Sequence, residues 1–130
     1  MTLNTSHYDK VGGDKGVRKL VDRFYDLMDD REDATTLRNL HAKSLKASRD
    51  KLYLFLSGWL GGPSLYIEKY GHPRLRQRHL PFKITSLERD QWVSCMSQAL
   101  DEQIDDPLLL ESMKLSFYKV ADHMRNTEDD

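Results

Sequence analysis

The chain has 130 residues, a formal net charge of −1 from 20 basic and 21 acidic side chains, and a single cysteine. This length suits one domain with its own core, and one cysteine excludes an internal disulfide and a metal site built only of cysteines. The balanced charge gives no overall attraction to nucleic acid or to an anionic membrane. No apolar run approaches the roughly 20 residues of a membrane span. Residues 1–10 have no apolar signal core, so we expect a soluble cytoplasmic domain.

Two helices are predicted in the first half of the chain. Asp14 follows two glycines and is the predicted N-cap of the first helix. The buried face of this helix has the period of an amphipathic helix and consists of Val17, Leu20, Val21, Phe24 and Met28. The apolar side chains of the second helix are Leu45, Leu52, Phe55, Leu56 and Trp59. The second helix should end at the Gly-Gly-Pro of residues 61–63, because glycine adopts left-handed torsions and proline cannot extend a helix.

Two more helices are predicted in the second half. Thr85 and Glu88 have the spacing of a capping box ahead of the third helix. Asp106 and Pro107 suit the N-cap and the first position of the fourth. The apolar face of the third helix consists of Trp92, Val93, Met96, Ala99 and Leu100, and that of the fourth of Leu110, Met113, Phe117, Val120, Ala121 and Met124. No long stretch has the alternating period of a strand, so the predicted fold class is all-α.

The segments between these helices are predicted to be irregular. Residues 31–44 are polar and should form short turns. Residues 61–86 contain repeated glycine and proline, and long connections of this kind are usually functional or disordered. This one carries too many aromatic and apolar residues for disorder. At the end of the chain, residues 125–130 are predicted to form a tail, acidic and frayed from Thr127 onward.

The chemistry of the 61–86 segment stays open on residue types alone. Arg74, Arg76 and Arg78 could form a basic patch for phosphate, or could pair with the many carboxylates of the chain. His72 and His79 are not spaced as zinc ligands on one helix, and no cysteine or carboxylate pair completes such a site. One interpretation is therefore a cofactor-free helical module that binds nucleic acid or an acidic partner through this arginine-rich loop.

Several motifs, taken together and in order, resemble those of the group II truncated haemoglobins. They are Val-Gly-Gly at 11–13, Arg-Phe-Tyr at 23–25, Gly-Gly-Pro at 61–63, Tyr-Gly-His-Pro-Arg-Leu-Arg at 70–76, Arg-His-x-Pro-Phe at 78–82 and Glu-Arg-Asp-x-Trp at 88–92. The resemblance extends over about residues 8–124. It implies a single truncated globin domain over residues 1–130, in which two antiparallel helix pairs enclose haem b, two over two.

The resemblance also implies which side chains face the iron. His79 matches the proximal histidine, and a neutral imidazole nitrogen is the usual axial ligand of globin iron. Tyr25, His41 and Trp92 match the distal residues, which supply a hydroxyl, a titratable imidazole and an indole that can only donate. Whether Tyr25, His41, water or no ligand occupies the sixth position of ferric iron stays open.

The resemblance further implies which residues hold the cofactor. Leu52 and Phe55 would lie over the haem, and Phe82 is a further expected contact. Arg78, with Lys51 and Tyr66, would bind the haem propionates, because a guanidinium matches carboxylate geometry.

The implied function is binding of O2, CO and NO. Several donors directed at one bound ligand in a dry pocket should slow its release. This favours NO or peroxide detoxification, or sensing, over O2 transport. NO dioxygenase-like or peroxidase-like turnover would need an unidentified reductant, and the protein could be a monomer or a homodimer.

Overall fold

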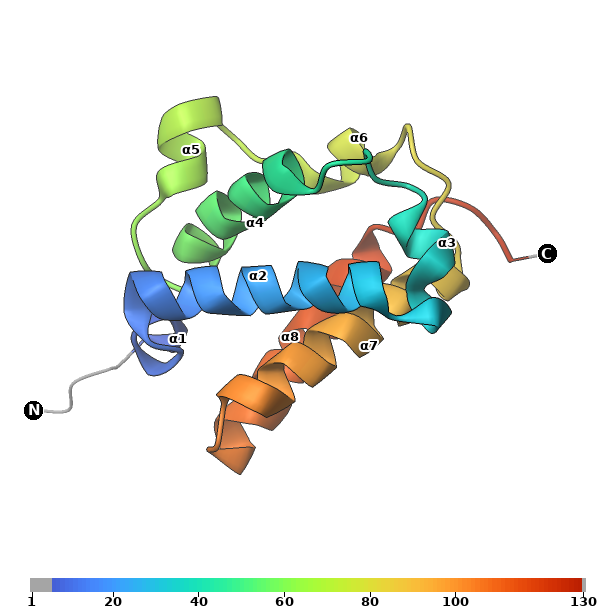
Figure 1. Cartoon of the computed structure of the whole chain (residues 1–130). Coiled ribbons are helices and arrows are strands. Elements are labelled where there is room, and N and C mark those ends of the chain that lie inside the picture. The colour runs from blue at the N-terminus through green and yellow to red at the C-terminus, as the bar shows by residue number, and fades with distance from the viewer. Residues whose placement is uncertain (1–5, 130) are drawn as a thin grey trace, which may run out of the picture.

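The computed structural model describes residues 6–129, and every regular element in that range is a helix (Figure 1). The long helices are α2 (Gly13–Asp30), α4 (Lys46–Trp59), α7 (Ser86–Gln103) and α8 (Pro107–His123). The short ones are α1 (His7–Lys10), the 3₁₀ helix η1 (Glu32–Ala34), α3 (Thr35–Arg38), α5 (Leu65–Tyr70) and α6 (Leu75–His79). The predicted all-α class is confirmed. Within the described residues, no helix is long and apolar enough to cross a membrane.

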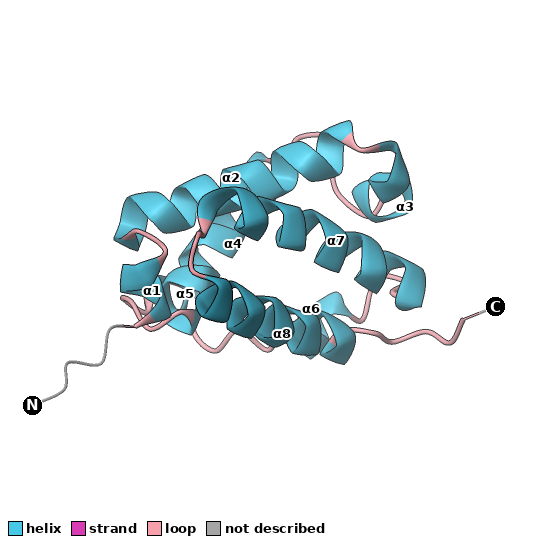
Figure 2. Cartoon of the chain, turned by 90° about the horizontal axis from the view of Figure 1, so that it is seen from below, coloured by secondary structure: helices cyan, strands magenta, loops and turns pink. Residues whose placement is uncertain are grey.

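The four long helices form two pairs that pack on each other. α2 packs on α4, α7 packs on α8, and α2 also packs on α7. The two helices of each pair run in opposite directions (Figures 1 and 2). Of the short helices, α5 lies against α4 and α1 against α2. This is the two-over-two arrangement that the sequence motifs imply.

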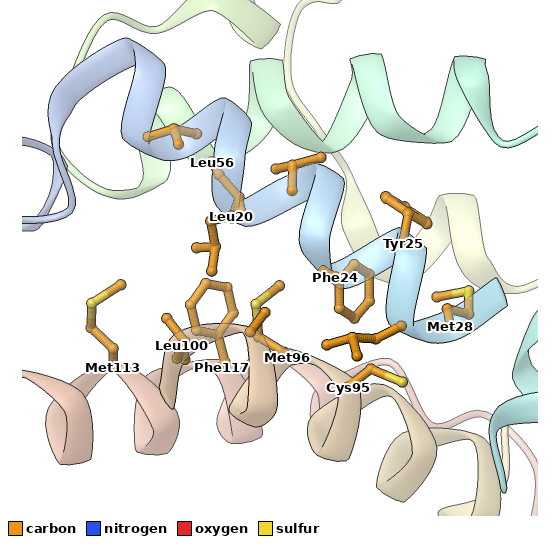
Figure 3. Close-up of a cluster of buried hydrophobic side chains, with 14 of the residues drawn as sticks. Leu20, Phe24, Tyr25, Met28, Leu56, Cys95, Met96, Leu100, Met113 and Phe117 are labelled. Carbon is orange, nitrogen blue, oxygen red and sulfur yellow. The ribbon is translucent and has the colours of Figure 1, made fainter. Parts of the chain in front are cut away.

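The hydrophobic core lies where α2 meets α7 and α8 (Figure 3). The predicted face of α2 is confirmed, since each of its members is 0% exposed: Val17, Leu20, Val21, Phe24 and Met28. Leu56 enters from α4, Met96 and Leu100 from α7, and Met113 from α8. Burial of this apolar surface is the main favourable contribution to folding.

Three of the predicted helix ends are confirmed. Thr85 and Glu88 form a capping box at the start of α7, with the Thr85 N–H donating to Glu88 Oε1 over 2.7 Å. The Asp106 carboxylate accepts from the first free N–H groups of α8, which begins at Pro107. α4 ends at Trp59, shortly before Gly61, whose φ of 100° is the left-handed conformation expected of that glycine.

The predicted N-cap of the first helix is wrong. α2 begins at Gly13, and its N-cap is Gly12, whose φ is 110°. Asp14 instead lies in the first turn, where its carboxylate accepts a hydrogen bond from the Tyr53 hydroxyl of α4. The chain turns from α1 into α2 through a conformation that glycine adopts most easily, and this fixes the start of the helix one residue before Asp14.

The segments predicted to be irregular hold more helix than expected. Residues 31–44 contain η1 and α3, and residues 61–86 contain α5 and α6. Each of these helices is six residues or shorter. Gly71, with a φ of 79°, separates α5 from the segment that leads to α6.

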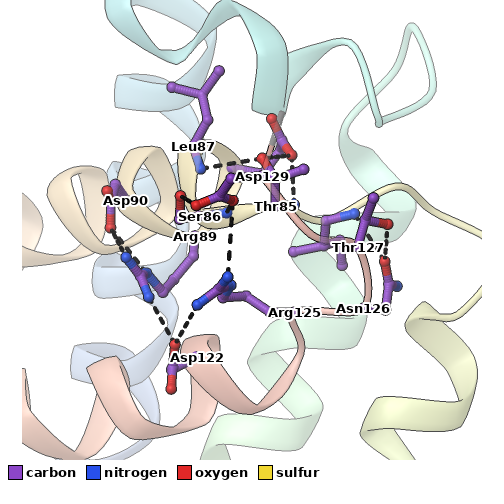
Figure 4. Close-up of polar contacts among 12 residues, drawn as sticks. Thr85, Ser86, Leu87, Arg89, Asp90, Asp122, Arg125, Asn126, Thr127 and Asp129 are labelled. Atoms are coloured by element: carbon purple, nitrogen blue, oxygen red, sulfur yellow. Dashed lines mark hydrogen bonds and ion pairs between the residues drawn. The ribbon is translucent and has the colours of Figure 1, made fainter.

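The end of the chain is docked rather than frayed. The N–H groups of Asn126 and Thr127 donate to the Ile84 carbonyl over 3.0 and 3.2 Å. The Ser86 hydroxyl donates to the Asp129 carboxylate over 2.6 Å (Figure 4). The prediction of a frayed tail is therefore wrong for Thr127 and Asp129, because these residues bond to Ile84 and to the first residue of α7. Residue 130 lies outside the described residues.

Gly16 should be intolerant of any side chain. A Cβ there would lie 1.9 Å from the Val11 carbonyl oxygen, and backbone cannot rotate away as a side chain does. We expect Gly16→Ala to lower the free energy of unfolding by about 1–3 kcal/mol in chemical denaturation. The control is Gly58→Ala, where a Cβ would lie 3.2 Å from Ser64 Cα. Both are helical glycines and gain the same helix propensity, so equal effects would contradict the steric explanation.

Candidate functional site

His79 is the last residue of α6, and its side chain is half-buried. Its Nδ1 lies 2.6 Å from the carbonyl oxygen of Leu75, one turn earlier. Because a carbonyl only accepts, Nδ1 carries the proton and Nε2 carries the free lone pair. Metal-binding histidines are typically held in this manner, with the second ring nitrogen bonded to a backbone carbonyl or a carboxylate.

The three predicted distal residues come together from separate segments. Tyr25 lies on α2, His41 follows α3, and Trp92 lies on α7. The rings of Tyr25 and His41 are 6.0 Å apart and nearly perpendicular. Phe24 joins the cluster, with its ring centroid 4.9 Å from that of Tyr25 and 5.0 Å from that of Trp92.

The Tyr25 hydroxyl is held in its neutral form. The side chain is only 6% exposed, and burial raises its pKa well above the ordinary value for tyrosine. The Arg49 guanidinium, 5.8 Å from the centre of the Tyr25 ring, opposes this shift without cancelling it. Tyr25 therefore keeps a proton to donate throughout the physiological pH range.

His41 is also neutral near pH 7. Burial lowers its pKa below the ordinary 6.5, and the Leu37 carbonyl, which accepts from Nδ1 over 2.9 Å, acts in the opposite direction. The nearby charge of Arg38 lowers the pKa further.

Three of the predicted contacts of the cofactor, Phe55, Tyr66 and Arg78, lie next to one another. Phe55 on α4 and Tyr66 on α5 meet edge to face at 6.3 Å, and the Arg78 guanidinium lies 5.8 Å from the centre of the Tyr66 ring. Leu52 lies on the same helix as Phe55 and is half-buried. Lys51 is exposed, and within the described residues no hydrogen bond or ion pair joins it to Tyr66 or Arg78.

Apolar side chains flank His79 on the surface. Leu80 is 55% exposed and Phe82 is 44% exposed, which is high for side chains of this size. Exposed apolar surface next to a polar donor is typical of a binding site.

A cavity of about 840 Å³ opens between α4, residues 72–77 and the end of α8. Its apolar lining consists of Phe55, Trp59, Pro73, Leu75, Val120 and Met124, and its polar rim of His72, Arg74, Arg76, Gln77, Lys119 and His123. It adjoins the site at Phe55 and Leu75, although neither His79 nor the distal residues line it. From the sequence, Trp59, Val120 and Met124 are predicted only as members of apolar helix faces. Trp59 shares its face with Phe55, and Val120 and Met124 share theirs with Phe117, and this is the only sequence signal for the cavity.

These residues fit haem. The cofactor presents a wide apolar face, two carboxylates and an iron that takes an imidazole ligand. The cavity offers apolar walls and a cationic rim in the size range of small-molecule sites. His79 offers an Nε2 lone pair on a ring held by Leu75, and Arg78 offers a guanidinium for a carboxylate.

The arginines do not form one free basic patch. Arg76 donates to the carbonyl oxygens of His123 and Arg125 over 2.9 and 2.6 Å, so it joins α6 to the end of α8. Arg78 lies against Tyr66. This arrangement does not support the nucleic-acid alternative.

Comparison with known proteins agrees with this geometry. The family model for bacterial-like globins matches residues 6–126. Group 2 truncated haemoglobin YjbI of Bacillus subtilis is 42% identical over 94 residues, which are 72% of this chain and 68% of that protein. The cold-adapted truncated haemoglobin of the Antarctic marine bacterium Pseudoalteromonas haloplanktis TAC125 matches with a TM-score of 0.93 and 46% identity, over 95% of this chain and 99% of that one.

The solved structure of the truncated oxygen-avid haemoglobin from Bacillus subtilis matches with a TM-score of 0.84 and 35% identity, over 94% of this chain and 100% of that one. The matches thus agree in fold and in sequence over most of the chain. The chain belongs to the bacterial-like globin family, as a group II truncated haemoglobin, and is a haem b protein that binds diatomic ligands such as O2.

Proposed function

We propose that His79 is the axial ligand of the haem, and that Tyr25, His41 and Trp92 form a distal pocket from which diatomic ligands leave slowly. The observation that carries this proposal is the His79 imidazole, whose Nδ1–H is held by the Leu75 carbonyl over 2.6 Å and whose Nε2 is left to coordinate. The distal assignment is supported by the packing of Tyr25 and Trp92 on Phe24 and by the position of His41 beside Tyr25.

Haem, when bound, supplies an iron that coordinates one diatomic ligand on its distal side. The chain supplies the rest. Arg78, backed by the Tyr66 ring, binds a propionate, and the exposed Lys51 supplies a second cation. The apolar contacts with the cofactor come from Leu52, Phe55 and Phe82.

The distal residues act by donating hydrogen bonds. Tyr25 has one O–H and Trp92 one N–H, and both can donate to a polarised ligand. Such bonds are stronger in a dry pocket than in water, because no solvent competes for the acceptor. In neutral His41, Nδ1–H is already bonded to Leu37, so Nε2 is an acceptor that orients a neighbouring donor.

Slow release suits reaction better than transport. A carrier must unload its ligand on the timescale of delivery, whereas a protein that holds O2 can react with NO or peroxide, or act as a sensor. The similar Bacillus subtilis haemoglobin that is described as oxygen-avid supports this reading. We infer a redox role in NO or peroxide detoxification or in sensing, with a separate reductant that returns the iron to the ferrous state.

Replacing the axial ligand should be visible in the optical spectrum. We expect the ferrous His79→Ala variant to lose the five-coordinate spectrum. The ferric variant should lose hemin at least about tenfold faster than the wild type, because changes to residues that merely support a metal ligand already have effects of this size. Added imidazole should restore the spectrum. The control is His7→Ala, because His7 lies at the start of α1 and does not line the cavity. An unchanged spectrum and full haem retention in His79→Ala would rule out the assignment.

Removing either distal donor should speed ligand release. We expect Tyr25→Phe and Trp92→Phe each to raise the O2 dissociation rate by about tenfold or more, the factor for one hydrogen bond to a charged group. Stopped-flow displacement of O2 by CO measures this rate. Tyr53→Phe is the control, since the Tyr53 hydroxyl bonds to Asp14. The proposal would be contradicted if the wild type released O2 quickly and neither substitution changed the dissociation rate.

The distal pocket should respond to acid but not to base. Because burial lowers the pKa of His41 below 6.5, its imidazole is neutral at pH 7, and Nε2 changes from acceptor to donor only on acidification. We expect the C–O stretching frequency of the CO complex, measured by infrared spectroscopy, to be constant from about pH 7 to 9. When the pH is lowered below about 6, we expect this frequency to decrease. His41→Phe should show no such change, and an identical acid transition in that variant would assign it to another group.

A further inference from the structure

We propose that Asn126, beyond the end of α8, is a positioning residue for His79: it fastens the loop that follows α6 and so fixes the imidazole. This inference rests on the role of His79 proposed above. It gives the C-terminal segment, residues 123–129, a task in cofactor binding that neither its composition nor its position after the last helix suggests.

The side-chain amide of Asn126 forms hydrogen bonds to the loop that follows α6 through both its nitrogen and its oxygen. Its Nδ2 donates to the carbonyl oxygens of His79 and Phe82 over 3.1 and 2.8 Å. Its Oδ1 accepts from the Ile84 N–H over 3.0 Å, and its own N–H donates to the Ile84 carbonyl over 3.0 Å. One residue therefore bonds to both ends of the segment 79–84 and to a point between them. Figure 4 shows Asn126 next to Thr127.

The contact reaches His79 through its own backbone. The His79 carbonyl accepts from the Phe82 N–H over 3.0 Å and from Asn126 Nδ2. A side chain cannot hold its position better than the backbone that carries it, and a metal ligand tolerates displacements of only a few tenths of an ångström. Fixing this carbonyl from two directions thus limits the movement of the His79 ring, whose tautomer Leu75 sets separately.

α6 needs contacts with other segments to hold its position, because few of its own side chains are packed in the core. It is five residues long and has no buried residue. It starts after Arg74, whose φ of 47° is costly for a residue with a Cβ. A helix this short has little stability by itself.

The C-terminal segment forms hydrogen bonds with both ends of α6. At the first turn, Arg76 donates to the carbonyl oxygens of His123 and Arg125 over 2.9 and 2.6 Å. At the last residue, Asn126 donates to His79. The segment itself is held to the start of α7 by Asp129, which accepts from the Ser86 N–H over 2.9 Å. The helix that carries His79 is thus tied to α8 and α7 by polar contacts.

The test is Asn126→Ala in the haem-loaded protein. We expect hemin transfer to an apomyoglobin acceptor to be roughly five- to thirtyfold faster, the factor for losing one to two net hydrogen bonds. The resonance Raman band of the ferrous iron–histidine stretch should shift or broaden, and the amides of residues 79–84 should exchange with deuterium faster. Asn126→Asp keeps the acceptor but loses both donors, so it should behave like Asn126→Ala.

Two controls separate positioning from a general loss of stability. Asn39→Ala removes an exposed asparagine at the end of α3 and should leave the Raman band and the hemin transfer rate unchanged. Gly16→Ala destabilises the fold far from the loop and should leave the iron–histidine band unchanged. A shifted band in Asn126→Ala, with both controls at the wild-type frequency, supports the proposal.

The failure of this inference is distinguishable from that of the proposed function. If His79→Ala abolishes the iron–histidine band while Asn126→Ala keeps the wild-type band and hemin transfer rate, the positioning role is overturned and the axial assignment stands. If His79→Ala keeps the band, the axial assignment fails and the positioning role fails with it.

Discussion

The packing of Phe24 against Trp92 is the contact on which the distal side of the site depends. Phe24 is 0% exposed, and its ring lies 5.0 Å from that of Trp92, so it sets how α2 sits on α7. Tyr25 is the next residue along α2, about 100° further around the helix axis. With Phe24 in the core, Tyr25 faces α4 and the chain after α3, where Arg49 and His41 contact it. One core contact thus positions Tyr25 and Trp92, the two proposed distal donors.

The two sides of the site are held by different forces. Two of the proposed distal residues, Tyr25 and Trp92, stand on long helices that are fixed by apolar burial, which is non-directional and resists local change only because the core is close-packed. His79, the proposed axial ligand, stands on α6, which has no buried residue and is held by directional hydrogen bonds to the C-terminal segment. On the proposed roles, we expect a substitution on the distal side to act mainly on the ligand, and one at Asn126 or Arg76 to act on the attachment of the cofactor.

The sequence predicts what local patterns encode. The long helices and the caps at Thr85 and Asp106 follow from periodicity and short spacings, and the structure confirms them. The short helices α5 and α6 escape prediction because their stability comes from tertiary contacts rather than propensity. The site residues came from resemblance to a family, since residue types alone left His79 ambiguous. Asn126 could not be found at all, because its partner His79 is 47 positions away and no local pattern marks the pair.

The modest hydrophobic content of the chain, 38%, is understandable once the cofactor is counted as part of the core. The cavity walls at Phe55, Trp59 and Met124 are apolar, and Phe82 beside His79 is 44% exposed. Haem covers such surface with its own apolar faces, and a ligand that binds only the folded chain adds its binding free energy to stability. Residues that retain haem thereby also stabilise the fold. On the role proposed for Asn126, the polar C-terminal segment belongs to the folding unit as much as the buried helices do, because it holds α6 and the loop after it, where His79 lies.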